Sequence, residues 1–508
     1  MSKDRPRILI VTPEITYLPE GMGNLSGKMS AKAGGMADVS ASLVSALHLL
    51  GADVHVALPH YRRMFHVETA QLVSEELRKY KSHLPHERIH LAEDRCFYYR
   101  DTVYSRGDGN LKLALAFQRE VINNIIPHVQ PDLIHCNDWM TGLIPAAARR
   151  EGIPCLFTVH NIHTHRLTLA QVEDAGIDGA EFWQNLYYGY PPYNYEESRN
   201  QNLIDLQASG CFAAHFINTV SPTFLQEIVN GWHSFIPDSI RNEIRNKFRA
   251  GCAEGILNAP DPVDNPVTDD KIPFKYGPDS HWEAKRRNKL ALQHALGLEE
   301  NADKALFFWP SRLDPVQKGP QLLTDITYRF LEKHPDAQLA IIASGPFQQP
   351  FWDIQNFHGI HSRLGIHNFD GRLSQLGFAG SDFTLMPSLF EPCGLPQMQA
   401  PIYGSLAVAH NTGGLHDTVV PLDAAKSTGN GFRFDTYDSG GLMWAMDQAM
   451  DFFHQSREMR EREIRRIMTE SLARFNHEAC AREYIKLYER MLQRPLVARK
   501  SADAKTAR

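Results

Sequence analysis

The sequence is poor in cysteine and lacks any regular cysteine spacing. The 508 residues contain seven cysteines, an odd number, and no two of them form a Cys-x-x-Cys pair. Disulfide frameworks and cysteine zinc sites depend on paired spacings, so the sequence argues against both and favours a reducing compartment. The seven are Cys96, Cys136, Cys155, Cys211, Cys252, Cys393 and Cys480.

Long apolar stretches are also absent. No run approaches the roughly 20 apolar residues that a membrane-spanning helix needs. The N-terminal segment Met1–Glu14 holds only a short strand-like run, Ile8–Val11, and no small-residue cleavage pattern follows it. This argues against a signal peptide, so we predict a cytoplasmic protein without a membrane partner.

The chain lacks a large charge of either sign. Its 53 basic and 59 acidic residues give a formal net charge of -6. Proteins that bind nucleic acid or anionic membranes usually carry a strong positive field, so we predict no nucleic-acid partner. The sequence carries no signal for an oligomeric state.

Short apolar runs, in contrast, recur along the chain. With 43% hydrophobic residues the protein can bury ordinary cores. Most runs end at Gly, Pro, Asn or Ser, and helical patterns lie between many of them, which is typical of buried parallel strands joined by crossover helices. The pattern appears twice, so we predict an α/β fold with two doubly wound domains. The runs are Arg7–Thr12, Val54–Leu58, Leu133–Cys136, Cys155–Val159, Phe216–Val220, Ala305–Trp309, Leu339–Ala343, Phe383–Met386 and Leu406–Ala409.

A segment rich in Pro, Asp and Asn, Asn258–Lys271, predicts the domain boundary. We therefore expect an N-terminal domain over 1–260 and a C-terminal domain over 261–477. A last helix, within 478–495, is expected to pack back on the N-terminal domain. The polar tail 496–508 is expected to be disordered.

Glycine-rich turns adjoin predicted helices at two places. Ser30–Asp38 reads SAKAGGMAD, and Asn411–Asp417 reads NTGGLHD directly after a predicted strand. Glycines let backbone amides approach an anion, and a helix N-terminus favours negative charge, so each turn is a candidate phosphate cradle. For the first turn an equal alternative is a tight loop with Asp38 in the first turn of the helix.

Charged side chains follow two predicted strands of the second half. Arg312 and Lys318 follow the run 305–309, and Glu391 lies in SLFEPCGL after the run 383–386. Open α/β sheets bind ligands at the carboxyl ends of their strands, where two cations would neutralise a diphosphate. The plainer alternatives are a surface pair of cations and a helix-start glutamate beside a proline.

Two further motifs end strands of the first half. They are HCNDW, His135–Trp139, and TVHN, Thr158–Asn161. A single histidine at such a position is more often structural than catalytic. His163-x-His165 lacks a third ligand at helical spacing, so we predict no metal site.

Taken in order, these segments resemble the bacterial and plant-type glycogen and starch synthases. The resemblance runs from Arg7 to about Gln493. Its most specific pieces are GSDFTLMPSLFEPCGLPQ (Gly380–Gln397) and YGSLAVAHNTGGLHDTV (Tyr403–Val419). Supporting pieces are AGGMADV, HCNDWMTGL, FTVHNI, NTVSPTF, GILN and SRLDPVQKG.

The resemblance implies a GT-B fold, in which two Rossmann-like domains face a central cleft. It implies transfer of glucose from ADP-glucose or UDP-glucose to the non-reducing end of an α-1,4-glucan or maltooligosaccharide. The transfer would retain the anomeric configuration and use neither metal nor cofactor. The implied donor-binding residues are Lys32, Gly35, Cys393, Gly394, Leu395, Thr412, Gly413 and Gly414.

The resemblance also assigns catalytic roles. Arg312 and Lys318 would stabilise the departing diphosphate, and Glu391 would anchor sugar hydroxyls. Asp138 and His160 would lie near the reacting carbon, on the acceptor side.

Several positions depart from the family pattern. Arg312 and Lys318 are separated by one residue more than usual, and Gln207 stands where a lysine is common. Ala33, Ala259-Pro260 and Pro401 are further departures. They leave open a catalytically impaired glucan- or nucleotide-binding homologue, or a same-fold glycosyltransferase with a different acceptor.

Two segments have no assigned role. The insertion 15–29 is expected to border the cleft. The tyrosine-rich stretch Glu181–Tyr195 is either a platform for sugar rings or a packed local loop.

Overall fold

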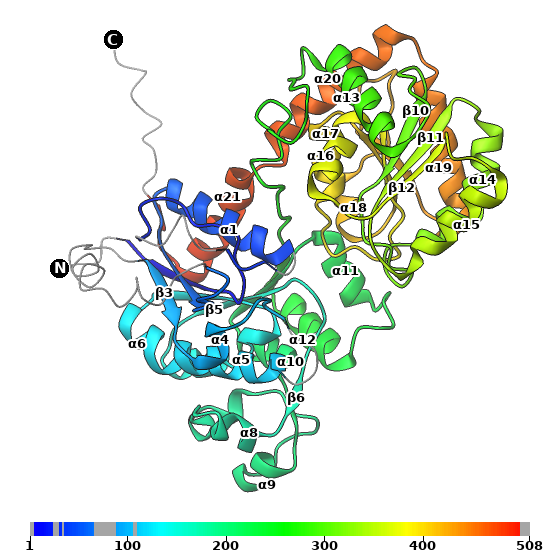
Figure 1. Ribbon diagram of the computed structural model, residues 1–508. Coiled ribbons are helices and arrows are strands. Elements are labelled where there is room, and N and C mark those ends of the chain that lie inside the picture. The colour runs from blue at the N-terminus through cyan, green and yellow to red at the C-terminus, as the bar shows by residue number, and fades with distance from the viewer. Residues whose placement is uncertain (1–4, 24–29, 33–34, 66–87, 105–108, 498–508) are drawn as a thin grey trace, which may run out of the picture. The chain divides into compact units, whose positions relative to one another are not determined.

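The computed structural model describes residues 5–23, 30–32, 35–65, 88–104 and 109–497. Within them the chain forms two compact units, each built on a parallel sheet (Figure 1). Unit 1 takes in the chain up to Val220, then Leu225–Ile256, and the chain from His477 onward. Unit 2 comprises Ser221–Phe224 and Leu257–Asn476. The predicted α/β class with two Rossmann-like halves is confirmed.

Unit 1 contains a seven-stranded parallel sheet in the order β3-β2-β1-β4-β5-β8-β9. This is the doubly wound 3-2-1-4-5-6 order with one more edge strand. Its strands are β1 (Arg7–Val11), β2 (Asp53–Pro59), β3 (Ile89–Ala92), β4 (Leu133–Asn137), β5 (Cys155–Val159), β8 (Phe216–Thr219) and β9 (Ala253–Gly255).

Helices cover both faces of the unit 1 sheet, and the first packs against the last (Figure 1). They are α1 (Gly35–Leu49), α4 (Arg95–Tyr98), α5 (Gly109–Glu120), α6 (Ile126–Val129), α7 (Ile144–Arg150), α10 (Leu206–Ala213), α11 (Pro222–Asn230), α12 (Asp238–Arg249) and α21 (His477–Leu492). The last helix is fixed to the sheet by two buried contacts. Tyr488 Oη lies 2.7 Å from His135 Nδ1, and Tyr484 Oη accepts from Asn218 Nδ2 at 3.0 Å.

A small lobe extends from unit 1 between α7 and α10 (Figure 1). It contains the antiparallel pair β6 (Arg166–Leu167) and β7 (Ile204–Asp205), with α8 (Leu169–Asp174) and α9 (Tyr195–Asn200). The tyrosine-rich stretch lies here, and its members differ in environment. Tyr188 donates to Trp183 O at 2.9 Å and is buried, whereas Tyr193 is 87% exposed.

Unit 2 contains a six-stranded parallel sheet in the order β12-β11-β10-β13-β14-β15, again the doubly wound order. Its strands are β10 (Ala305–Trp309), β11 (Ala337–Ile342), β12 (Leu364–His367), β13 (Phe383–Met386), β14 (Leu406–His410) and β15 (Gly431–Phe434). Its helices are α13 (His281–Leu296), α14 (Pro320–Lys333), α15 (Gln349–His358), α16 (Gly371–Gly380), α17 (Pro396–Ile402), α18 (Gly413–Thr418), α19 (Ser439–Phe453) and α20 (Arg457–Arg474).

The strands form where the apolar runs lie because a strand covered on both faces must be apolar throughout. All five residues of β10 and all six of β11 are buried. Phe307 packs against Phe383 and Phe330, with ring centres 4.7 and 5.2 Å apart. In the part of the chain that the structure describes, no helix is both long and apolar enough to cross a bilayer.

We expected one domain boundary after residue 260, whereas the chain crosses between the two units at several points. The units divide at Ile256 and Leu257, and the short segment Ser221–Phe224 belongs to unit 2 although its neighbours on either side belong to unit 1. The expected tail 496–508 falls mostly outside the described residues, as does the second part of the insertion 15–29. A backbone hydrogen bond holds the start of the described part of the insertion: Ile15 N donates to Ala31 O at 3.0 Å.

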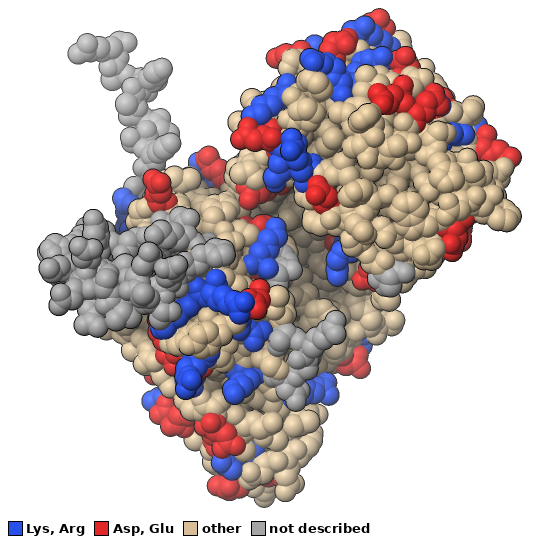
Figure 2. All heavy atoms as spheres, viewed as in Figure 1, with Lys and Arg blue, Asp and Glu red and all other residues tan. Residues whose placement is uncertain are grey.

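Acidic and basic side chains alternate over the face shown in Figure 2, in both units. Many are paired, such as Arg62 with Glu93 at 3.1 Å. This agrees with the small net charge, because paired surface charges give no strong field of one sign.

Candidate active site

Glu391 lies in the loop after β13 in unit 2. Its side chain is 7% exposed, and its Oε2 accepts hydrogen bonds from Lys318 Nζ at 2.5 Å and Ser388 Oγ at 3.0 Å. A buried carboxylate is tolerated as an anion when it is paired and hydrogen-bonded in this way. The structure therefore brings Lys318 and Glu391 together. Ser388, to which the sequence assigned no role, completes the group. Its position three residues before Glu391 was the feature of the sequence that could have indicated this contact.

The loop between β10 and α14 carries Arg312 and Lys318. The carbonyl of Asp314 accepts from Lys318 N at 2.8 Å, so the extra residue in this loop is taken up in a turn. Gln317 O accepts from Leu389 N at 2.8 Å, which ties this loop to the loop after the neighbouring strand β13. The Arg312 side chain is exposed and forms no hydrogen bond or ion pair with any described residue.

The Gly413-Gly414 turn packs directly against the Glu391 loop. Gly414 N donates to Glu391 O at 2.9 Å. A Cβ atom at Gly413 would collide with Glu391 O, and one at Gly414 would collide with Cys393 O. Gly413 also has a positive φ of 44°, so glycine is required here for both conformation and space. Thr412 precedes the turn as the N-cap of α18.

The segment Cys393–Leu395 forms the other wall of this group. Gln397 Nε2 donates to Cys393 O at 2.9 Å and to Gly394 O at 3.0 Å. Gly394 has φ 72°, and Leu395 is the N-cap of α17. Unit 2 thus gathers most of its predicted residues at the carboxyl ends of β10, β13 and β14, where the strand order reverses and doubly wound sheets bind ligands.

In unit 1, Asp138 and His160 follow the adjacent strands β4 and β5. Asp138 is 2% exposed, and its Oδ1 accepts from His160 N at 2.8 Å. Asn161 Nδ2 donates to the other oxygen at 2.5 Å. Asp138 has φ 56°, an uncommon conformation for a residue with a side chain, and such strain concentrates at functional sites.

Burial dominates the protonation of this pair. It raises the pKa of Asp138 to about 7 even though hydrogen bonds from His160 N and Asn161 favour the anion. Burial also lowers the pKa of His160 to about 4, so the ring is neutral at pH 7. His160 Nε2 lies 2.9 Å from Asn137 Oδ1 and donates to it. Gln207, fully buried, donates from Nε2 to Asn161 O at 3.0 Å and supports the same loop.

The turn before α1 is described only in part. Lys32 Nζ pairs with Asp38 Oδ2 at 2.6 Å, and Gly35 is the first residue of α1. Ala33 and Gly34 lie outside the described residues. Among the residues that are described, no group of three His, Cys, Asp or Glu side chains is arranged to hold a metal ion. The His165 ring packs against Trp139 in a tilted arrangement, with ring centres 4.4 Å apart.

Two family models match the chain. The starch synthase catalytic domain matches residues 7–237, and the glycosyl transferases group 1 model matches residues 296–466. Together with the two doubly wound sheets, these matches define a glycosyltransferase of the GT-B fold.

Relatives identify the family. The glycogen synthase of Cellvibrio japonicus is 33% identical over 485 residues, covering 90% of this chain and 96% of that protein. The glycogen synthase of Moorella thermoacetica is 31% identical over 519 residues, covering 96% and 97%. The catalytic domain of starch synthase IV from Arabidopsis thaliana, bound to ADP and acarbose, covers 97% of this chain and 100% of that chain, with 25% identity and a TM-score of 0.76. The chain belongs to the glycogen synthase family.

Proposed function

We propose that the protein transfers glucose from ADP-glucose or UDP-glucose to the non-reducing end of an α-1,4-glucan, with retention of configuration. The observation that carries this proposal is the Lys318–Glu391–Ser388 group beside the Gly413-Gly414 turn. It combines a cation, which suits phosphate, with a fixed carboxylate, which suits sugar hydroxyls, beside a glycine turn at the start of a helix. The solved relative bound to ADP and acarbose supports the same ligand classes.

The proposed mechanism follows the charge that develops during transfer. Breaking the bond between sugar and diphosphate leaves negative charge on the diphosphate. Arg312 and Lys318 would stabilise that charge beside the Thr412–Gly414 turn, and Lys32 and Gly35 would add to it from unit 1. One such preorganised donor is often worth about 3–4 kcal/mol, so this set would need no metal ion.

The sugar itself requires other groups. Glu391 would hold its hydroxyls with the amides of Cys393–Leu395. Positive charge grows on the ring in the transition state, and the Asp138 carboxylate would stabilise it in its ionised form. Neutral His160 gives its Nε2 hydrogen to Asn137 Oδ1, so its Nδ1 would accept a hydrogen bond from a sugar hydroxyl.

A donor screen with product sizing tests the proposal. The protein is incubated with ADP-glucose or UDP-glucose and a maltooligosaccharide of defined length. We expect release of the nucleoside diphosphate together with a ladder of longer oligosaccharides. Release without elongation would point to another acceptor, and glucan binding without any turnover would point to a non-catalytic homologue; either result contradicts the proposal.

A further inference from the structure

A cavity of about 40 Å³ lies against α13 in unit 2, far along the strands from the Glu391 group. Its wall includes Asp382 and Leu406, which stand at the amino ends of β13 and β14, whereas Glu391 and Gly413 follow the carboxyl ends. We call it the α13 cavity. Basic side chains from two helices line it: His281, Lys285, Arg286 and Lys289 from α13, and Arg460 from α20.

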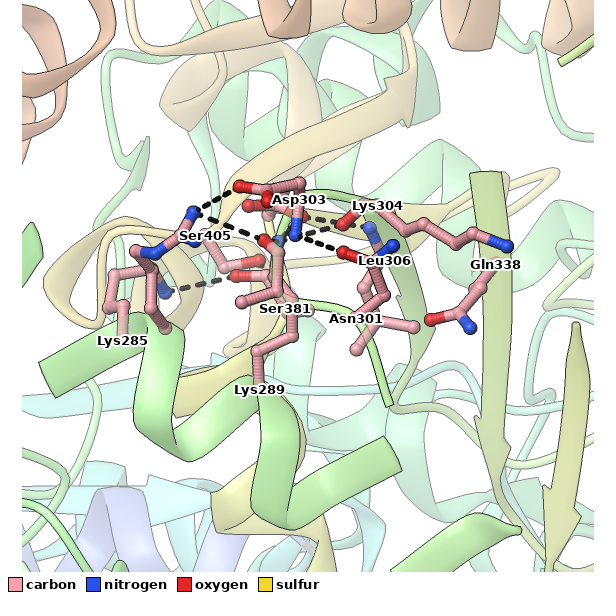
Figure 3. A network of polar contacts seen from close by, with 12 residues as sticks. Lys285, Lys289, Asn301, Asp303, Lys304, Leu306, Gln338, Ser381 and Ser405 are labelled. Carbon is pink, nitrogen blue, oxygen red and sulfur yellow. Dashed lines mark hydrogen bonds and ion pairs between the residues drawn. The ribbon is translucent and has the colours of Figure 1, made fainter. Parts of the chain in front are cut away.

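Positive charge exceeds negative charge around the α13 cavity. Lys289 pairs with Asp382 at 2.6 Å, and Arg286 pairs with Asp303 at 2.7 Å. Lys285 forms no ion pair with any described residue. Figure 3 shows Lys285 and Lys289 extending from α13 into a network of backbone carbonyl groups and polar side chains.

The ammonium group of Lys285 is buried among these positive charges without a carboxylate partner in the described part of the chain. Its Nζ donates to the carbonyl oxygens of Ala379, Ser381 and Tyr403 at 3.1, 2.9 and 2.9 Å. These contacts use all three of its hydrogens but supply no full negative charge. The pKa of Lys285 is lowered to about 7, chiefly by burial; Asp382 opposes this shift, and the neighbouring Lys289 adds to it. An anion in the α13 cavity would relieve this repulsion.

Arg460 is the cation best placed to receive an anion. Its guanidinium carbon lies 5.2 Å from the ring centre of Trp282 and 4.7 Å from that of Phe453. Its side chain forms no hydrogen bond or ion pair with any described residue, and its Nε atom is buried. A buried donor without a partner is costly, so the arrangement calls for an acceptor.

His281 contributes a second buried atom without a partner. The residue is 1% exposed, and its Nδ1 lies 2.6 Å from Pro278 O. A carbonyl can only accept, so Nδ1 carries the hydrogen and Nε2 of the neutral ring is an acceptor. No described residue donates to Nε2. The α13 cavity therefore offers donors on Arg460 and an acceptor on His281.

We propose that the α13 cavity binds inorganic phosphate. Phosphate at neutral pH has oxygens that accept from Arg460 and a P–OH group that donates to His281 Nε2. Sulfate has the same size but no hydrogen to donate, and a phosphomonoester dianion also lacks one. One water needs roughly 10–15 Å³ of such space, so the α13 cavity has room for about three to four water-sized groups, close to the four oxygens of one phosphate ion and far too little for a nucleotide.

Thermal unfolding and calorimetry of the full-length protein test this proposal. Phosphate at about ten times its dissociation constant should raise the unfolding temperature by about 2–4 °C. Sulfate, chloride and glycerol phosphate at the same ionic strength should give clearly smaller shifts. If phosphate stabilises no more than sulfate does, the proposal is wrong.

Matched variants separate this cavity from the proposed donor site. Arg460→Met should abolish the phosphate-specific shift. Arg457→Met should retain it, because Arg457 lies on the same helix and 5.1 Å from the same Trp282 ring but pairs with Glu283 and Glu461 and does not line the α13 cavity. His281→Phe should lose the preference for phosphate over sulfate.

Two outcomes would overturn the assignment. A full phosphate shift in Arg460→Met would mean that phosphate binds elsewhere, such as the glycine turn at Gly413. If Arg460→Met does not fold, Arg460→Lys, which keeps the charge with fewer donors, should weaken the calorimetric affinity for phosphate at least about tenfold; an unchanged affinity would contradict the proposal.

Discussion

At the scale of single residues, Lys318 and Glu391 act as one unit. They share a contact of 2.5 Å in a nearly buried position, so neither side chain keeps its environment when the other is removed. Replacing one partner of such a pair leaves the other charge uncompensated. Effects on turnover should therefore be large for each single variant and far from additive in the double variant.

We expect Glu391→Gln and Lys318→Met each to lower kcat at least about a hundredfold, which corresponds to about 2.7 kcal/mol of lost transition-state stabilisation. Initial rates with the active donor measure this. The pair Glu299 and Lys304, also in contact at the surface of unit 2, provides the control. Glu299→Gln and Lys304→Met should keep nearly full activity, and near-normal activity in the Glu391 and Lys318 variants would remove both from the mechanism.

Asp138 predicts how activity depends on pH. Its pKa is raised to about 7 by burial, so only part of the protein carries the ionised carboxylate at neutral pH. The proposed mechanism uses the ionised form, because positive charge develops on the sugar. We therefore expect kcat/KM to rise with pH through a midpoint near 7 and then to level off.

Asp138→Asn should be much less active and should lose this rise, because the amide does not titrate. Asp174→Asn, an exposed position on α8 of the same unit, should keep the wild-type profile. If kcat/KM still rises with pH in Asp138→Asn, the titration of another group causes the rise. Between about pH 4 and 7, the folded protein keeps Asp138 protonated, whereas the unfolded chain has already released this proton. Raising the pH through this range therefore lowers the stability of the folded state.

At the scale of elements, α18 links the glycine turn to the start of α11. The Asp417 carboxylate accepts from Ser221 Oγ at 2.5 Å, from Thr223 Oγ1 at 2.6 Å and from Thr223 N at 3.1 Å. It thus caps α11 from another element, and Phe224 on α11 lies next to Gly413. Arg474, the last residue of α20, donates to Asp417 O at 2.8 Å, so α20 also contacts α18 at Asp417.

We expect Asp417→Ala to lower stability by about 1–2 kcal/mol, the scale of a lost helix cap, and to raise the donor KM more than it lowers kcat. Chemical denaturation and initial rates measure the two effects. Ser221→Ala should cost less in the Asp417→Ala background than in wild type, because the bond to Asp417 is already lost there and only the bond from Phe224 N remains to be removed. Asp423→Ala, which removes only an exposed pair with Lys426, is the control; equal effects of the two substitutions would contradict this role.

The sequence predicts elements well where one local rule decides them. The run Ala305–Trp309 is apolar throughout and forms β10 with the same bounds, and the Gly413 turn follows its strand as expected. Prediction from the sequence fails for a contact between two residues that are distant along the chain. Nothing around Ser221 indicates that Asp417, almost two hundred residues later, accepts its hydrogen bond.

At the scale of the whole molecule, buried histidines make unit 1 sensitive to acid. Burial lowers the pKa of His135 to about 3 and that of His160 to about 4. The folded unit keeps both rings neutral, while the unfolded chain binds protons below about pH 6.5. Stability is therefore lost as pH falls from about 6.5 towards 4, at up to about 1.4 kcal/mol per pH unit for each ring.

We expect the unfolding free energy to fall steeply between pH 7 and 5 in wild type and less steeply in His135→Gln, which has no ring to protonate. Urea unfolding at several pH values measures the slope. His294→Gln, which changes an exposed histidine beside Glu300, is the control. An unchanged slope in His135→Gln would show that other groups drive acid unfolding.

The position of α21 has a consequence for synthesis of the protein. Tyr484 and Tyr488, which contact buried side chains of the unit 1 sheet, follow the last strand of that sheet, β9, only after nearly all of unit 2. At about 5–20 residues per second, unit 1 waits on the order of tens of seconds for the helix that completes it. During that interval its apolar surface under α21 stays open, so newly made chains should depend on chaperones until α21 has emerged.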